Sequence, residues 1–314
     1  MLNNHLYTAF YSLYYSHTDM PTNKNISKPT TLHWVTLWSL GLLWGCSFFL
    51  IKKGLVCYTP VQTASIRIGV TSLAFLPFFI WHFKKINWKN LKYYAIVGLA
   101  GSGIPAFLFA NAQTEVSSSV SGILNSLTPL FTLIIGIVFF NNKENVRKFF
   151  GVLLGLGGAV ILILYGKELN TGGHISYSLL IILATICYAT SVNTVKKFLQ
   201  EENPLVLSAV AFQIIGIPSL IVLFNTDFRG KLQLDHEAWV ALGYLVILAF
   251  VGTFMATVLF FGLVQKTDAL FGSMTTYIIP IMAIFLGLLD GEVLEISHGM
   301  GMAAILGGVY LSRK

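Results

Sequence analysis

Charged side chains are scarce in this sequence. Only 11% of its 314 residues are Asp, Glu, Lys or Arg, whereas 55% are hydrophobic and 14% are aromatic. An ordinary soluble domain has about 25% charged residues. The mean hydropathy is +0.73, and a surface so poor in charge needs lipid as its solvent. The composition excludes an ordinary soluble protein and indicates one embedded in a bilayer.

Motifs for several kinds of chemistry are also absent. The three cysteines include no CxxC pair, so the sequence predicts neither a disulfide framework nor a metal site. No Walker-type phosphate loop occurs, which argues against ATP hydrolysis by this chain. The seven histidines lie in tails, loops or the ends of apolar runs, and no Asp-rich motif lies within a run. We expect no cofactor, and a membrane-embedded enzyme is kept only as an alternative.

Basic residues outnumber acidic ones, 20 against 13, but they form short clusters between apolar runs and no continuous patch. Nucleic acid is therefore not an expected partner. Lys and Arg are enriched in cytoplasmic loops of membrane proteins. With the N-terminus inside, fourteen of the 20 fall on the cytoplasmic side and five outside, with Arg67 within the membrane. We expect both termini in the cytoplasm, and the expected location is the bacterial inner (plasma) membrane.

Ten apolar runs follow a polar segment, residues 1–33, which we interpret as a cytoplasmic tail. A helix needs about 20 apolar residues to cross a bilayer, and each run is close to that length. Helices are the expected structure because no water satisfies backbone groups within the hydrocarbon. The sequence thus predicts an all-α polytopic membrane protein with ten transmembrane helices at about 34–51, 61–81, 93–113, 116–139, 149–166, 175–195, 204–224, 238–262, 269–289 and 296–312.

The second half of the chain repeats the first. Residues 44–55 match residues 188–199 at an offset of 144, which pairs Ser47 with Ser191 and Pro60 with Pro204. Residues 121–129 match 272–280 at an offset of 151. Each repeat holds five runs, an odd number, so the second repeat must enter the membrane from the opposite side. The sequence predicts two inverted five-helix repeats, with a substrate site where they meet.

Short motifs occur in a fixed order along these runs. One of them is a Gly-Glu dipeptide, the Gly-Glu step, which follows the ninth run. The corresponding place after the fourth run has Asn-Asn-Lys-Glu at 141–144, so the step is clear only in the second half. The motif residues are Trp44, Gly45 and Phe48 in helix one, Pro60 and Arg67 in helix two, Pro129 in helix four, Pro280 in helix nine, and Gly291 with Glu292 after helix nine.

This pattern resembles the drug/metabolite transporter superfamily, specifically its EamA-type two-domain members with ten helices. The resemblance covers about residues 34–312. It implies a first EamA-like repeat at 34–166 and a second at 175–312. It also implies transport, usually export, of small organic metabolites such as amino acids, other amphipathic compounds or toxic compounds.

Arg67 is the clearest ionisable residue within a predicted helix, and such residues are functional candidates by default. It lies near the outer surface, where an arginine can also reach the interface and act as an anchor. A role in substrate binding or gating and a role in anchoring are both open. Its repeat mate is Ala211, so only one half of the protein can use this charge.

Neutral polar side chains in the runs must face protein or a water-filled cavity, because lipid offers them no partner. Asn125 lies one turn before Pro129, and its repeat mate Thr276 lies one turn before Pro280. A proline frees the carbonyl one turn earlier, for a ligand or for a bend; packing alone is the alternative. Asn111, Asn193 and Gln213 are further candidates, and some of these will only bridge helices.

Aromatic residues complete the predicted pocket. Trp44 and Tyr188 are repeat mates, each three residues before a serine, which places ring and hydroxyl on one helical face. The alternative is an aromatic belt at the membrane interface. The expected substrate-binding residues are Trp44, Ser47, Arg67, Asn111, Asn125, Tyr188, Asn193, Gln213 and Thr276.

Helices five and ten differ from the rest because they are rich in glycine and almost free of hydrogen-bonding side chains. Glycine lets backbones approach closely. We expect these helices to pack against neighbours or a second copy of the chain, which makes a homodimer through helices five and ten a further expectation.

The function expected from these features is secondary transport of a small-molecule substrate across the lipid bilayer by alternating access, and the family resemblance implies export as its direction. Ion channels are disfavoured because neither a carbonyl filter motif nor an acidic ring is evident. Besides the membrane-embedded enzyme, a lipid flippase is the alternative.

Overall fold

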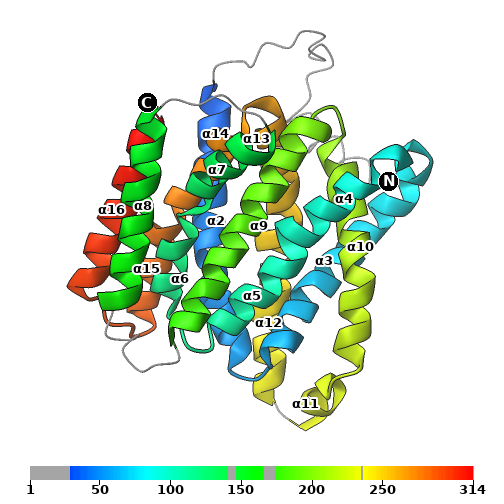
Figure 1. The fold of residues 1–314 in the computed structure, drawn as a ribbon. Coiled ribbons are helices and arrows are strands. Elements are labelled where there is room, and N and C mark those ends of the chain that lie inside the picture. The colour runs from blue at the N-terminus through cyan, green and yellow to red at the C-terminus, as the bar shows by residue number, and fades with distance from the viewer. Residues whose placement is uncertain (1–28, 141–145, 166–173, 235, 314) are drawn as a thin grey trace.

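The computed structural model describes residues 29–140, 146–165, 174–234 and 236–313, which form helices joined by short connections, without a strand among them (Figure 1). Eight helical segments in these ranges are long and apolar enough to cross a membrane. The helices α8 (Val146–Tyr165) and α16 (Ile296–Arg313) complete the ten that the sequence predicts. The all-α architecture of two five-helix repeats is therefore confirmed.

The elements of the first repeat follow the predicted runs closely. Helix three is continuous but contains a π-helical segment, and helix four is divided in two. In chain order the elements are α2 (Thr31–Leu55), α3 (Pro60–His82), the 3-10 turns η1 (Phe83–Lys85) and η2 (Trp88–Asn90), α4 (Leu91–Gly98), η3 (Leu99–Gly103), α5 (Ile104–Ala112), α6 (Ser118–Asn125), α7 (Thr128–Phe140) and α8.

The second repeat has the same order of elements. A short helix between its second and third spans, α11, was not expected from the sequence. The elements are α9 (His174–Phe198), α10 (Pro204–Phe224), α11 (Phe228–Leu234), α12 (His236–Ala249), η5 (Phe250–Met255), α13 (Ala256–Lys266), α14 (Ala269–Ser273), η6 (Met274–Tyr277), α15 (Ile279–Leu289) and α16.

The second span of each repeat begins at the same kind of signal. Thr59 precedes Pro60 and accepts a hydrogen bond from the Gln62 N–H, which starts α3. Asn203 precedes Pro204 and its Oδ1 accepts from the Leu205 N–H, which starts α10. A side-chain cap satisfies a helix N–H that has no partner in the helix, and proline fits the first helical position because its missing N–H is not needed there.

Spans three and eight both contain a π-helical segment that the sequence did not predict. These segments are η3 and η5, and their residues correspond at the offset of 151. In η3 the cause is Pro105, two residues after the end of the segment. Proline has no N–H to donate to the carbonyl four residues earlier, and its ring would clash with that carbonyl in a regular α-helix. In η5 the Thr253 hydroxyl donates to the Leu248 carbonyl five residues earlier, at 3.0 Å. A π segment widens the helix, and such segments are frequent at functional sites.

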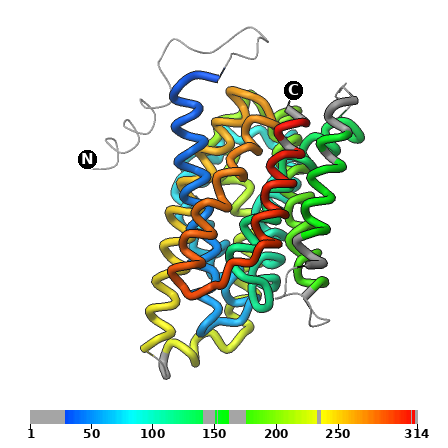
Figure 2. Tube along the Cα trace, turned by 90° about the vertical axis from the view of Figure 1, so that its left-hand side faces the viewer, coloured from blue at the N-terminus to red at the C-terminus, as the bar shows by residue number. Residues whose placement is uncertain are grey.

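The helices pack as a bundle in which two pairs of repeat mates lie side by side. The most extensive contacts join α3 to α10 and α8 to α16, which are the second and fifth spans of the two repeats. The first spans exchange partners, because α2 packs on α15 and α13 while α9 packs on α7 and α5. The beginning of α2 and the end of α16 lie at the same end of the bundle (Figure 2).

Glycines hold α8 and α16 together within one chain. A methyl group at Gly158 would meet the Gly301 carbonyl, at 2.8 Å. A methyl group at Gly308 would lie closer still to the Gly151 carbonyl. The glycine-rich faces of α8 and α16 thus pack against each other, at one flank of the bundle (Figure 1). The homodimer through the same helices stays a prediction.

Candidate functional site

A central cavity lies where the two repeats meet. The volume of this cavity is about 90 Å³. Both repeats contribute hydroxyls and aromatic rings to its wall, with one cation. The lining residues are Trp44, Ser47, Phe48, Ile51, Arg67, Gly101, Ser102, Phe109, Asn125, Thr128, Tyr188, Ser191, Val192, Gly252, Thr253, Thr257, Phe260, Phe261, Ser273, Thr276 and Ile279.

The structure brings six of the nine predicted site residues to this cavity. Their positions explain the grouping, because each lies on the inner face of the first, second, fourth, sixth or ninth span. These six are Trp44, Ser47, Arg67, Asn125, Tyr188 and Thr276.

The other three predicted residues do not line the cavity, because their amides have partners elsewhere in the protein. Asn111 donates to the Phe107 carbonyl in its own helix, at 2.7 Å. Asn193 donates to the Thr132 carbonyl at 3.0 Å and so joins two spans. Gln213 exchanges hydrogen bonds with Ser72: its Nε2 donates to the Ser72 carbonyl at 2.8 Å, and its Oε1 accepts from the hydroxyl.

Arg67 is the only cation among the residues that line the cavity. Its Nε donates to Thr253 Oγ1 at 2.9 Å, which ties α3 to the π segment η5. It forms no ion pair with any residue in the described ranges. A guanidinium has five N–H groups, so Thr253 leaves most of this donor capacity facing the cavity.

Two aromatic side chains that are repeat mates, Trp44 and Tyr188, both line the cavity. Trp44 donates its indole N–H to the Gly252 carbonyl at 2.9 Å, and its ring meets Phe260 edge-on at 5.0 Å between centroids. Tyr188 stacks on Phe109 at 6.0 Å. The indole N–H of Trp44 is thus already satisfied, and its ring is what the tryptophan offers to a ligand.

The two π segments meet the first spans at equivalent positions. Gly252 of η5 faces Ser47, and a methyl group on this glycine would lie 3.0 Å from the serine oxygen. Gly101 of η3 faces the equivalent Ser191 still more closely, at 2.5 Å. Glycine is needed at both places because the helix backbone passes directly over a serine side chain. These two contacts are thus equivalent parts of the cavity wall, each with one residue from each pair of repeat mates.

The breaks in spans four and nine face each other, but their free carbonyls are occupied. Pro129 removes the N–H that would bond the Asn125 carbonyl, and the Thr128 hydroxyl donates to that carbonyl at 2.8 Å. The Thr276 carbonyl accepts from the Ser126 hydroxyl at 3.0 Å. The first of these hydrogen bonds stays within span four, and the second joins the two repeats. What faces the cavity at this place is the Asn125 side chain, whose buried Oδ1 has no hydrogen-bond partner.

Several lining residues were missed by the sequence reasoning. Ser191 and Thr253 belong to this group, together with Gly101, Gly252 and Ser102. A signal was present in the repeat, because Ser191 is the mate of the predicted Ser47. Gly101 and Gly252, like Ser102 and Thr253, are mates at the offset of 151. Extending that offset to the third and eighth spans would have found both pairs.

Comparison with known proteins gives one family across both repeats. The chain matches the EamA-like transporter family twice, over residues 34–164 and 175–313. A solved crystal structure shares the fold at a TM-score of 0.59 with 14% sequence identity, covering 90% of this chain and 96% of its own.

Similar proteins occur in archaea and bacteria. An "Uncharacterized transporter" of Archaeoglobus fulgidus is 24% identical over 279 residues, which cover 88% of this chain and 97% of that protein. The "Uncharacterized inner membrane transporter YedA" of Escherichia coli K12 is 24% identical over 88% of each chain. "Uncharacterized transporter YoaV" of Bacillus subtilis is 25% identical over 87% of this chain and 94% of its own. The chain therefore belongs to the EamA-like transporter family and is an integral membrane transporter.

Proposed function

We propose that this transporter exports small organic metabolites that carry a carboxylate on an apolar body, and that it does so by alternating access through the central cavity. The observation that carries the proposal is Arg67, a cation in the cavity wall without an ion-pair partner in the described ranges. A charge away from bulk water is costly unless it is paired. A ligand carboxylate supplies that partner and accepts two parallel hydrogen bonds from a guanidinium.

The rest of the wall supports an amphipathic ligand. Asn125 offers an unpartnered Oδ1 to a ligand N–H or O–H group. Aromatic rings from both repeats, including Trp44, Tyr188 and Phe260, provide the apolar surface that ligand pockets generally have. The proposed substrates are amino-acid-like metabolites or other small compounds with this pairing of groups. The proposed substrate contacts are the six predicted residues that line the cavity, together with Thr253.

The orientation is part of the same proposal. The bias of Lys and Arg places both termini in the cytoplasm of a bacterial cell, with the protein in the inner membrane. The end of the bundle that carries the beginning of α2 and the end of α16 then faces the cytoplasm (Figure 2). Export begins with the cavity open at this end and finishes with it open at the other.

Flux into proteoliposomes tests the proposal. A panel of radiolabelled carboxylates is compared with the matching uncharged amides, for the native protein, Arg67→Ala, Arg67→Lys and the control Arg229→Ala, which removes an arginine of α11. We expect carboxylate flux to fall about tenfold or more in Arg67→Ala, because a hydrogen-bonded charge contact contributes about 1.5–3 kcal/mol. Arg67→Lys should retain part of it and Arg229→Ala all of it.

Two outcomes oppose the proposal. Equal transport of carboxylates and amides by the native protein would show that Arg67 does not select an anionic group. Movement of labelled phospholipid without movement of any soluble compound would favour the flippase instead. Protein abundance in the membrane is measured for each variant, and a loss of folded Arg67→Ala would show that the arginine acts as an anchor.

A further inference from the structure

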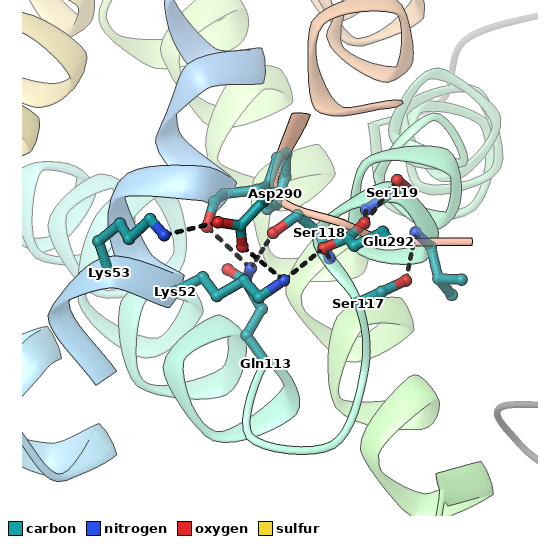
Figure 3. Close-up of polar contacts among 10 residues, drawn as sticks. Lys52, Lys53, Gln113, Ser117, Ser118, Ser119, Asp290 and Glu292 are labelled. Atoms are coloured by element: carbon teal, nitrogen blue, oxygen red, sulfur yellow. Dashed lines mark hydrogen bonds and ion pairs between the residues drawn. The ribbon is translucent and has the colours of Figure 1, made fainter. Parts of the chain in front are cut away.

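An ionic cluster joins the two repeats at the end of the bundle opposite the beginning of α2 and the end of α16 (Figure 2). Its members are Lys52 and Lys53 at the end of α2, and Asp290 and Glu292 just after α15. Lys52 Nζ lies 2.8 Å from Asp290 Oδ2 and 3.0 Å from Glu292 Oε1, and Lys53 Nζ lies 2.5 Å from Asp290 Oδ1. Figure 3 shows Lys52 reaching both carboxylates.

Glu292 also holds the beginning of α6. Its carboxylate accepts the backbone N–H groups of Ser118 and Ser119 at 2.9 and 3.0 Å, and the Ser119 hydroxyl at 2.6 Å (Figure 3). Its side chain is only 5% exposed. A carboxylate at a helix N-terminus satisfies free N–H groups and faces the positive end of the helix dipole. Glu292 of the second repeat thus adds to the cap of the first repeat's own Ser117, whose hydroxyl accepts the Val120 N–H at 3.3 Å.

The surroundings are shaped for this carboxylate. Gly287 lies directly beneath it, and a methyl group there would overlap Glu292 Oε2 and the Ser119 hydroxyl. Gly291 turns the chain between the two acidic residues with φ at +84°, a conformation that glycine adopts without strain. The Gly-Glu step of the sequence is therefore a turn that delivers Glu292 to α6.

The three elements joined by the ionic cluster also form the cavity wall. Ile51 of α2 lines the cavity and precedes Lys52, Asn125 ends α6, and Ile279 begins α15. The same three elements share a buried apolar cluster that contains Phe48, Ile51, Val120, Ile123 and Ile279. For the cavity to open at this end, α2 must separate from α6 or α15, and the ionic cluster resists that separation.

The corresponding lysines at the other end of the bundle have different partners. Lys196 and Lys197 are the repeat mates of Lys52 and Lys53. Lys196 donates to the Gln265 and Thr267 carbonyls, and Lys197 donates to the Phe140 carbonyl at 3.5 Å. Neither forms an ion pair with a residue in the described ranges. Hydrogen bonds between two charged groups are stronger than those from a charge to a neutral carbonyl.

We propose that the ionic cluster is the latch of the transport cycle: Glu292, held by Lys52 and the α6 N-terminus, keeps this end closed and must separate from them before the cavity opens there. The inference rests on the proposed function, since it assumes a cavity that opens at each end in turn. Glu292 and Lys52 are positioning residues in this scheme. They touch no substrate, and they set which end of the cavity is open.

Accessibility of a cysteine in the cavity wall tests the latch without a known substrate. The reporter is Ser47→Cys in a chain whose three cysteines, Cys46, Cys57 and Cys187, are replaced by alanine. A small membrane-impermeant thiol reagent is applied to right-side-out and inside-out vesicles, and the rate of labelling is measured from each side.

The latch variants are Glu292→Gln and, as a milder change at the exposed edge, Lys53→Met. Lys231→Met is the matched control, because Lys231 at the same end donates only to the Cys57 carbonyl. Glu292→Gln should raise labelling from the latch side about tenfold, as expected for loss of one charge-assisted contact in a two-state equilibrium. Lys53→Met should raise it by a smaller factor, and Lys231→Met should leave it unchanged.

An unchanged rate from the latch side in Glu292→Gln, with normal membrane abundance and thermal stability, would overturn the latch. If Glu292→Gln does not fold, Lys53→Met decides by the same criterion. Failure of the transport proposal looks different, because it appears as absent carboxylate flux in the native protein. Labelling needs no flux, so each idea can fail alone.

Discussion

The two Lys-Lys pairs compare directly, because they occupy equivalent positions in the two repeats and lie at opposite ends of the bundle. Lys52 and Lys53 reach the carboxylates of Asp290 and Glu292, whereas Lys196 reaches only backbone carbonyls. The same dipeptide therefore makes ion pairs at one end of the bundle and weaker contacts at the other. The duplicated sequence puts both lysine pairs at equivalent backbone positions. The strength of their contacts depends on the residues that face them.

The cavity shows the same division between backbone and side chain. Both repeats keep a π segment in the third span and a break in the fourth, which are backbone features. The side chains differ, because Arg67 has Ala211 as its mate and Trp44 has Tyr188. Symmetry thus builds the scaffold, and under our two proposals the asymmetric side chains decide what is bound and which end opens first. Four changes test this division, in order of decreasing expected effect.

Glu292→Ala should cause the largest loss of stability. The change leaves Lys52 facing Asp290 alone and leaves two N–H groups of α6 without their acceptor. Removing one partner of a buried ion pair costs about 3–5 kcal/mol, and we expect the lower part of that range because Lys52 is 36% exposed. Thermal unfolding in detergent measures the loss. The exposed Glu201→Gln should change stability by no more than about 0.5 kcal/mol, and equal effects of the two would remove Glu292 from the account.

Gly287→Ala tests the same contact from the opposite direction, by adding atoms. The new methyl group overlaps the Glu292 carboxylate and the Ser119 hydroxyl, and overpacking of this kind costs about 1–3 kcal/mol. Gly243→Ala in α12 is the control, because its methyl group would meet nothing within 4 Å. The same unfolding assay applies. A fully stable Gly287→Ala with slow labelling from the latch side would show that the cluster tolerates displacement.

Thr253→Val compared with Ser102→Ala tests the asymmetry of the cavity. These residues are repeat mates at the offset of 151 and both line the cavity. Thr253 holds Arg67 in place, whereas Ser102 has no arginine opposite it because Arg67 is replaced by Ala211. Loss of one hydrogen bond to a charge is expected to raise KM for carboxylate flux about tenfold in Thr253→Val. Ser102→Ala should change KM little, and an equal change in both would mean that the two halves bind alike.

Acid should weaken the latch only at low pH, and this is the smallest effect at physiological pH. Burial alone would raise the pKa of Asp290, but hydrogen bonds from Lys52 and Lys53 hold it below its usual value. Burial also opposes ionisation of Glu292, whereas the Ser119 hydroxyl and the two backbone N–H groups lower its pKa. A lowered pKa contributes stability above the unfolded pKa, near 4, and loses it as pH falls through the folded value.

The thiolate is the reactive form of a cysteine, so the labelling rate of Ser47→Cys from the latch side is divided by the rate from the opposite side at the same pH. This ratio should be constant from about pH 8 to pH 5 and rise only below about pH 4. Glu292→Gln should show a smaller rise, because only Asp290 remains to be protonated. A rise between pH 8 and pH 6 in the native protein would assign the opening to a different titrating group.

Hydropathy was sufficient to predict most of the fold, because a run of about 20 apolar residues has few alternatives to a spanning helix. The run at 204–224 coincides with α10, and most other predicted ends lie within a few residues of the observed ones. The π segments were not predicted, since a widened helix leaves the average hydropathy unchanged. The short helix α11 was missed because its seven residues are too few to show a helical periodicity.

The cavity was predicted in part. Arg67 and Asn125 were found because an ionisable or amide group in an apolar run must face something other than lipid. Asn111 and Gln213 meet the same condition with partners inside the protein, and sequence spacing does not distinguish these cases. The ionic cluster was not predicted because its members lie about 240 positions apart and only folding brings them together. Lys52 follows the end of the first predicted helix, and Glu292 belongs to the Gly-Glu step. Nothing in the sequence indicates that these two residues form a pair.

Substrate protection of the cavity cysteine tests the central claim most directly. Ser47→Cys lies in the wall next to Trp44 and Gly252. In the protein that keeps Arg67, the transported carboxylate should slow the labelling of this cysteine, and the uncharged amide should not. Arg67→Ala should abolish the protection by the carboxylate and leave the labelling rate without substrate similar. Equal protection by carboxylate and amide, or full protection in Arg67→Ala, would contradict a cavity that binds its substrate through this arginine.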